Sequence, residues 1–232
     1  KINPTNINFR ANIDAFKQVG VTDIISVSAV GSLKENLEPG RFIVVDQFID
    51  RTFARKKTFF DNEIVAHVSM AKPVSKGLSN CCESVLKKLK IPYKMGGTYV
   101  VMEGPQFSTF AESNLYRSWN ADVIGMTNMP EAKLAREAEI RYCTVAMVTD
   151  YDCWHPDYDE VDVKMVVKTL MNNASKAQEM IKEIIKSFKK FSVERDPANN
   201  CLDVAIITDP SLRTKKTVKK LKNIAGRVLI KK

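Results

Sequence analysis

Hydrophobic positions along the chain follow a helical period in some stretches and a strand-like run in others. Residues 6–19 carry apolar side chains at a mixed helical spacing, and Gly20 ends this predicted amphipathic helix. Residues 23–30 are a short β-branched run and are predicted to form a strand. A second predicted strand, residues 41–49, follows a Glu-Pro-Gly turn signal.

The same alternation continues as far as residue 188. Further helices are predicted over residues 76–89, 112–119, 131–138 and 161–188, and further strands over residues 97–102, 122–125 and 142–149. Strands that alternate with helices form sheets covered by helices. We therefore expect an α/β fold with a mixed, largely parallel sheet flanked by helices. One more apolar run, residues 202–208, precedes the lysines near the C-terminal end.

Composition excludes several classes of protein. At 232 residues and 44% hydrophobic content, the chain can bury the core of one large domain or two small ones. No apolar run approaches the ~20 residues that span a bilayer, and the first residues lack the apolar centre of a signal peptide. Five cysteines fit no disulfide or zinc pattern, and two histidines argue against a histidine metal site. We expect a cytoplasmic protein without a membrane partner.

The net charge of +9 could indicate a nucleic-acid-binding protein, but the distribution of charge argues against it. Residues 211–232 contain nine lysines and arginines and no acidic residue. Residues 1–210 are balanced, since 36 basic residues less these nine leave 27 against 27 acidic residues. A basic tail on a neutral body is typical of a solvated end, whereas a basic stripe across a folded face is typical of nucleic-acid binding. We expect no nucleic-acid partner.

Two acidic residues follow the last predicted strand. Asp150 and Asp152 come directly after the apolar run of residues 142–149 and are followed by Trp154. In open α/β sheets the ligand lies in the crevice outside the carboxyl ends of the strands, so both carboxylates are placed where chemistry takes place. The alternative is that they only cap the next helix, because Asp is favoured at helix starts.

Two other segments offer groups for an anion and a flat ring. Ser28 and Ala29 at the end of the first strand are small, so backbone amides there can approach an anion, although a tight turn would need similar residues. Phe107 can stack on a flat ring or can be a core residue that caps the sheet. Ser108 beside it can hydrogen-bond to a ligand.

A further strand end completes the set. Met126 offers a soft apolar surface to a sugar, and the Thr127 hydroxyl can meet a phosphate. Together with the carboxylate of Asp150, these groups suit a nucleoside beside an inorganic anion.

Five segments closely resemble the trimeric class of the purine nucleoside phosphorylase family, especially its bacterial members that act on 5'-methylthioadenosine. They are SAVGSL, DQFIDRTF, EGPQFST, GMTNMPEAKLAREAEI and VAMVTDYDCWH, in the family's order. The resemblance implies a nucleoside phosphorylase domain over residues 1–191 and a basic extension over residues 192–232. It also implies a homotrimeric pentosyltransferase that cleaves 5'-methylthioadenosine with inorganic phosphate as co-substrate, without metal or cofactor. The products would be adenine and 5-methylthioribose 1-phosphate.

The resemblance also implies roles for individual residues. Asp150 would bind purine N7 and the 6-amino group, and Asp152 would orient and support Asp150. Residues expected to contact the nucleoside are Phe107, Ser108 and Met126, with His67, Val163 and Val166 around the methylthio group. Residues expected to bind phosphate are Ser28, Ala29 and Thr127.

The start of the chain departs from the family pattern. Lys1 matches the family just after an Arg-His pair that binds phosphate, and the family's Gly-rich phosphate loop is absent. We therefore expect an N-terminally incomplete domain with weakened phosphate binding. Two alternatives stay open. A 6-oxopurine nucleoside phosphorylase would carry Asn in place of Asp150 and Glu in place of Ser108, and a non-catalytic nucleoside-binding module would release no adenine.

Overall fold

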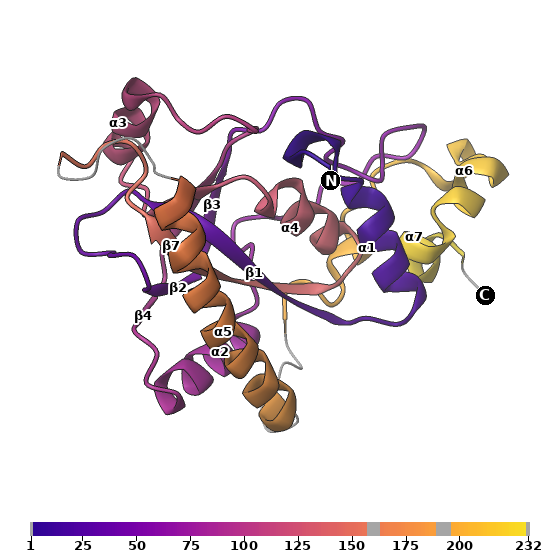
Figure 1. Ribbon diagram of the computed structural model, residues 1–232. Coiled ribbons are helices and arrows are strands. Elements are labelled where there is room, and N and C mark those ends of the chain that lie inside the picture. The colour runs from indigo at the N-terminus through magenta and orange to yellow at the C-terminus, as the bar shows by residue number, and fades with distance from the viewer. Residues whose placement is uncertain (1, 157–162, 189–195, 231–232) are drawn as a thin grey trace.

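The computed structural model describes residues 2–156, 163–188 and 196–230, which form a curled sheet with helices on both faces (Figure 1). The strands are β1 (Asp23–Ser32), β2 (Phe42–Val45), β3 (Gln47–Asp50), β4 (Tyr93–Met95), β5 (Thr98–Val101), β6 (Val123–Gly125) and β7 (Arg141–Asp150). The helices are α1 (Phe9–Gln18), α2 (Lys76–Lys88), α3 (Phe110–Ser118), α4 (Asn128–Glu137), α5 (Val163–Ser187), α6 (Lys215–Lys220) and α7 (Lys222–Leu229). Short 3-10 turns are η1 (Pro4–Asn6), η3 (Cys201–Asp203) and η4 (Pro210–Leu212).

The seven strands lie in the order β3-β5-β6-β1-β7-β2-β4. Four of the six strand pairs are parallel, so the prediction of a mixed and largely parallel sheet is confirmed. Side chains of α1, α4 and α7 pack on one face, and those of α2 and α5 pack on the other. None of the helices in the described ranges is both long enough and apolar enough to cross a membrane.

The stretch predicted as one strand over residues 41–49 is in fact two strands. It breaks at Asp46, after which β3 pairs with β5, whereas β2 pairs with β4 and β7. Residues 93–101 divide in the same way at Gly96, whose φ of +74° suits glycine. The same two chain segments therefore supply both ends of the strand order, and the sheet curls on itself.

The central pair, β1 and β7, sets the position of the site. Eight consecutive residues of β7 are buried, as is typical of a parallel strand covered on both faces. The two strands run parallel, so their carboxyl ends meet at one edge, where Gly31 pairs with Asp150 after a register shift. This edge is the one that the sequence predicts for the ligand.

The expectation of a solvated C-terminal tail is wrong for α7. Leu221, Ile224 and Ala225 are at most 4% exposed and belong to the core that α1 and α4 cover. The apolar run of residues 202–208 forms η3 and one bridge, between Ala66 and Ile206. Lysines surround the apolar face of α7. The net charge of the segment therefore did not predict that the helix packs into the core. The division of the chain at residue 191 stays a prediction.

Replacing Leu221 by Ala should lower the free energy of unfolding by about 2–5 kcal/mol, because it leaves a cavity in the shared core. Leu212, which is 70% exposed, is the matched control, and its replacement by Ala should change the free energy by less than about 0.5 kcal/mol. Urea unfolding of both variants measures the difference. Equal and small losses would show that the C-terminal helices do not stabilise the domain.

Candidate active site

A cavity of about 360 Å³ opens at the carboxyl ends of β1, β5, β6 and β7. Its walls include most of the residues that the sequence singles out: Ser28, Ala29, Phe107, Met126, Thr127, Asp150 and Asp152. Two larger hollows, of about 520 and 470 Å³, lie elsewhere, and neither is lined by two carboxylates. The smaller cavity is therefore the candidate site, in the crevice where α/β sheets bind ligands.

Asp150 ends β7, and its carboxylate organises the turn that follows. Oδ1 accepts the backbone N–H of Asp152 at 2.8 Å, and Oδ2 accepts the Thr149 hydroxyl at 2.7 Å. Asp152 has a φ of +54°, which is uncommon outside glycine. A Cβ on Gly31 would lie 2.9 Å from Asp150 Oδ1 and 3.3 Å from Asp152 Cβ. Glycine at this point of β1 therefore makes room for both acids.

The environment of the two acids favours their protonated forms. Burial raises the pKa of Asp150, and burial together with the charge of Asp150 raises the pKa of Asp152. The hydroxyls of Ser113 and Ser108 act in the opposite direction and offset part of the rise in the pKa of Asp152. Nevertheless, its buried Oδ2 makes no hydrogen bond of normal geometry to the described residues. A buried acceptor without a donor is costly, so a proton or a ligand donor would relieve it.

The position of the turn does not fit the helix-capping alternative. The next described helix, α5, begins at Val163, well beyond both acids. The turn is instead anchored by Trp154, whose indole N–H donates to the Ser32 carbonyl at 2.7 Å. The guanidinium of Arg117 lies 3.6 Å from the centre of the indole ring, within the range of a cation–π contact. Both acids are thus held at the cavity by the core beneath them.

Small polar residues form the wall of the cavity on the β1 side. The hydroxyl oxygens of Ser28 and Thr127 are 3.4 Å apart. Ser28 is 7% exposed, and Ala29 beside it is open to the cavity. Thr127 precedes α4, but its hydroxyl makes no capping bond to that helix. Two hydroxyls that can turn toward one point suit the oxygens of a phosphate.

Apolar side chains form another part of the wall. Phe107 is 56% exposed and lines the cavity, so the alternative that it is a core residue is wrong. Met126 packs against Gly104, where an added Cβ would lie 2.4 Å from its sulfur. Ser108 is one step removed, since its hydroxyl faces the sulfur of Met102 at 3.6 Å.

The residues expected around a methylthio group lie differently. His67 is exposed and does not line this cavity, and its backbone N–H donates to Ala205 at 2.8 Å. Val163 and Val166 lie at the start of α5, and their side chains are outside the described part of the structure. Within the described ranges, no group of histidines, cysteines and acids could hold a metal ion.

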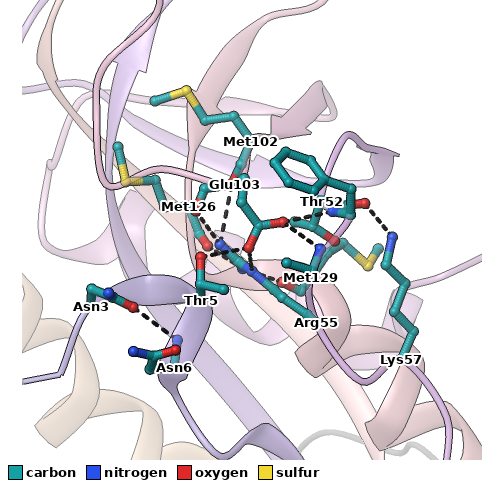
Figure 2. A network of polar contacts seen from close by, with 12 residues as sticks. Asn3, Thr5, Asn6, Thr52, Arg55, Lys57, Met102, Glu103, Met126 and Met129 are labelled. Carbon is teal, nitrogen blue, oxygen red and sulfur yellow. Dashed lines mark hydrogen bonds and ion pairs between the residues drawn. The ribbon is translucent and has the colours of Figure 1, made fainter.

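A buried ion pair that the sequence analysis did not identify joins the walls of the cavity (Figure 2). Arg55 Nε donates to Glu103 at 3.0 Å, and Nη2 donates to the backbone carbonyl of Glu103 at 2.6 Å. Nη1 donates to the carbonyls of Met126 and Met129, both at 2.6 Å. One guanidinium therefore fixes the chain where β5 ends, where β6 ends and where α4 begins.

Glu103 also accepts hydrogen bonds from two further segments of the chain. Its carboxylate accepts the Thr5 hydroxyl at 2.6 Å and the backbone N–H groups of Phe53 and Ala54 at 2.6 and 3.1 Å. Burial opposes the charged form, but these bonds and the one from Arg55 outweigh it and lower the pKa of Glu103 to about 2. A sequence signal existed only for Glu103, which stands directly after the strand predicted over residues 97–102, whereas Arg55 lies six residues beyond the strand predicted over residues 41–49.

The chain matches the family model described as the phosphorylase superfamily over residues 1–186. It is 60% identical over 227 residues to S-methyl-5'-thioadenosine phosphorylase from Rhodospirillum rubrum, covering 97% of this chain and 77% of that protein. The protein of the same name from Bradyrhizobium diazoefficiens is 52% identical, covering 99% of this chain and 79% of the relative.

Solved structures show the same likeness. A methylthioadenosine phosphorylase sourced from an antarctic soil metagenomic library has a TM-score of 0.91 and 43% identity, covering 97% of this chain and 79% of that chain. Methylthioadenosine phosphorylase from Schistosoma mansoni in complex with adenine has a TM-score of 0.78 and 31% identity, covering 82% of this chain and 73% of that chain.

Replacing Glu103 by Gln should destabilise the fold in a pH-dependent way. The pKa of Glu103 is about 2 in the folded protein, against an ordinary 4.5. Its ionised form therefore stabilises the fold above about pH 4.5, and this contribution, about 3 kcal/mol, is lost as the pH falls toward 2. The difference in unfolding free energy between wild type and variant should shrink accordingly between pH 5 and pH 2. Glu38→Gln, at an exposed ion pair, is the control, and a pH-independent loss at Glu103 would contradict the assignment.

Proposed function

The chain belongs to the phosphorylase superfamily, and we propose that it is a pentosyltransferase that cleaves 5'-methylthioadenosine with phosphate. The products are adenine and 5-methylthioribose 1-phosphate. The observation that carries the proposal is the pair of buried acids, Asp150 and Asp152, in one cavity with the hydroxyls of Ser28 and Thr127. The similarity to relatives named for this activity over 97% of the chain supports it.

The chemistry of the reaction matches the two sides of the cavity. Breaking the bond between C1' and N9 leaves positive charge on the ribose and negative charge on the purine. Asp150 in its protonated form passes its proton to N7, so that adenine leaves as a neutral base, and Asp152 supports Asp150. A phosphate oxygen, held by Ser28, Ala29 and Thr127, forms the new bond to C1'. Phosphate is the co-substrate, and the scheme uses no metal or cofactor.

The remaining walls cover the sugar and the base. Met126 packs against the ribose, Phe107 against the base and sugar, and Ser108 faces the purine edge. Shielding by such apolar groups keeps water from competing with phosphate for C1'. Val163 and Val166, at the start of α5, are proposed to line the methylthio end of the site.

The acid at position 150 favours an aminopurine over a 6-oxopurine. A protonated carboxyl donates to N7, and its other oxygen accepts a hydrogen bond from a 6-amino group. An amide at this position would donate to a 6-oxo oxygen but could not pass a proton to N7. Asp150 therefore supports adenine as the base, and phosphate-dependent adenine release separates the enzyme from a non-catalytic nucleoside-binding module.

We also infer that the enzyme is a cytoplasmic homotrimer that acts in purine and methionine salvage. Exposed apolar side chains support assembly, since Phe53, Phe107 and Phe110 are 81%, 56% and 63% exposed. The loop with Phe53 and the helix α3 are neighbours, because Arg51 stacks over Trp119 at 5.8 Å. Large exposed apolar patches mark interaction sites. Phe107 lies both on this surface and in the cavity wall, so a second copy would close the rim of the site.

The neighbouring copy also gives His67 a role. This histidine is exposed and lies outside the cavity of its own chain. The family resemblance implies that the methylthio end of the site borrows side chains from a neighbour. His67 is the residue that we propose for this contact.

Replacing Phe110 by Glu should weaken the trimer, because it places a charge in the apolar surface. Sedimentation velocity of the full-length protein at micromolar concentration should show a trimer for wild type and smaller species for the variant. Val19→Glu is the control, since Val19 is 79% exposed at the end of α1, away from α3 in Figure 1. A monomeric wild-type protein over the whole concentration range would refute the assembly.

Replacing Asp150 by Asn in the full-length protein should lower the turnover of 5'-methylthioadenosine by ~100-fold or more, because general acid assistance is typically worth that much. The loss on the 6-oxo analogue should be much smaller, since an amide can donate to its oxygen. Adenine and hypoxanthine release, with and without phosphate, measures both. Asp14→Asn on α1, where Asp14 bonds only to a nearby glutamine in the described structure, is the matched control.

Two outcomes would contradict this scheme. Equal losses on both substrates, with unchanged folding, would make Asp150 a structural residue. The proposed reaction would be refuted if the wild-type protein bound the nucleoside but released no adenine in the presence of phosphate. That result would support the alternative of a non-catalytic nucleoside-binding module.

A further inference from the structure

A buried phenol lies beneath the hydroxyl wall of the cavity, and the reaction scheme does not use it. Tyr99 is on β5 and has no exposed surface. Its Oη is 3.1 Å from the hydroxyl oxygen of Ser28. Since Ser28 and Thr127 are themselves 3.4 Å apart, the three hydroxyls form one cluster.

The neighbouring strand is shaped to admit this phenol. Gly125 ends β6, and a Cβ built there would lie 2.0 Å from Tyr99 Oη and 2.8 Å from its Cζ. No side chain could occupy that point while the ring stays in place. The absence of a side chain at residue 125 therefore lets the phenol reach Ser28, which lies on the far side of β6 in the strand order.

The distribution of protons in the cluster depends on this phenol. Burial raises the pKa of Tyr99 to about 12, so the phenol keeps its proton at neutral pH. Ser28 and Thr127 each have one proton, and both must point at an anion to bind it through two bonds. In the structure, the Ser28 proton has competing acceptors, namely Thr127 and the carbonyl of Ala29 at 3.4 Å. A hydroxyl whose lone pair accepts from Tyr99 still has its own proton free to donate.

We propose that Tyr99 is a positioning residue for phosphate, whose hydroxyl donates to the Ser28 hydroxyl and so leaves the Ser28 proton to point toward the anion. The inference rests on the proposed function, because it takes the hydroxyl wall to be the phosphate site. It adds a residue that touches neither substrate and acts through those that do.

The test is Tyr99→Phe in the full-length protein, which removes one oxygen and keeps the ring. The KM for phosphate should rise roughly threefold to tenfold, the factor expected for one lost hydrogen bond. The KM for 5'-methylthioadenosine and the kcat at saturating phosphate should stay near wild type. Tyr142→Phe is the matched control, since Tyr142 is also buried but its hydroxyl contacts Asn128 and Glu131. It should leave the phosphate KM unchanged.

A double-mutant cycle separates positioning from general stability. If Tyr99 acts through Ser28, adding Tyr99→Phe to Ser28→Ala should raise the phosphate KM little further. Fully additive effects, equal rises in both KM values, or an unchanged phosphate KM in Tyr99→Phe would overturn the proposal.

A second variant covers the case in which Tyr99→Phe does not fold. Gly125→Ala must displace the phenol from Ser28, and the folded protein should show the same selective rise in phosphate KM. An unchanged phosphate KM in this variant would overturn the proposal. Wild-type protein without phosphate-dependent adenine release would refute the proposed function itself, and this is measured before any variant is compared.

Discussion

The geometry of the site depends on one buried ion pair, between Arg55 and Glu103. The Arg55 side chain is 1% exposed, and its donors bond one carboxylate and the carbonyls of the chain around Met102, Met126 and Met129. Burying charges is expensive, and removing one partner of such a pair costs about 3–5 kcal/mol. Its hydrogen bonds join the ends of the paired strands β5 and β6 to the start of α4 and to the loop that contains Arg55. The cavity walls therefore keep their relative positions before any ligand arrives, which is the preorganisation that electrostatic catalysis requires.

Three glycines leave room for side chains of the site to lie close to the backbone. A Cβ on Gly31, Gly104 or Gly125 would lie within 2.9 Å of a side chain of the site: Asp150, Met126 or Tyr99, respectively. Each of these side chains passes across a neighbouring strand or turn that has no side chain of its own at that point. The ion pair fixes where the segments lie, and the glycines let functional groups approach the same small volume from different strands.

The sequence predicts the parts of this arrangement that depend on local pattern. Asp150 and Asp152 could be placed because they follow a buried apolar run, and strand ends bind ligands. The break at Asp46 could not, since residues 41–49 read as one apolar strand and only pairing with residues 93–101 divides them. Arg55 and Glu103 are 48 residues apart, and their contact leaves no trace in periodicity. The burial of Leu221 and its neighbours was not predicted, because the lysines that surround them are typical of a solvent-exposed segment.

The register between β1 and β7 determines how far the two acids lie from the hydroxyl groups of the cavity. Gly31 pairs with Asp150, and Ser28 precedes Gly31 by three residues on the same strand. A strand rises ~3.3 Å per residue, so the hydroxyl wall and the acids are separated by about 10 Å along β1. That spacing suits a ligand with an anion at its sugar end and a base at the other. In the proposed scheme, the acids determine which base leaves, the hydroxyls determine how tightly phosphate is held, and the bound nucleoside couples the two ends of the cavity.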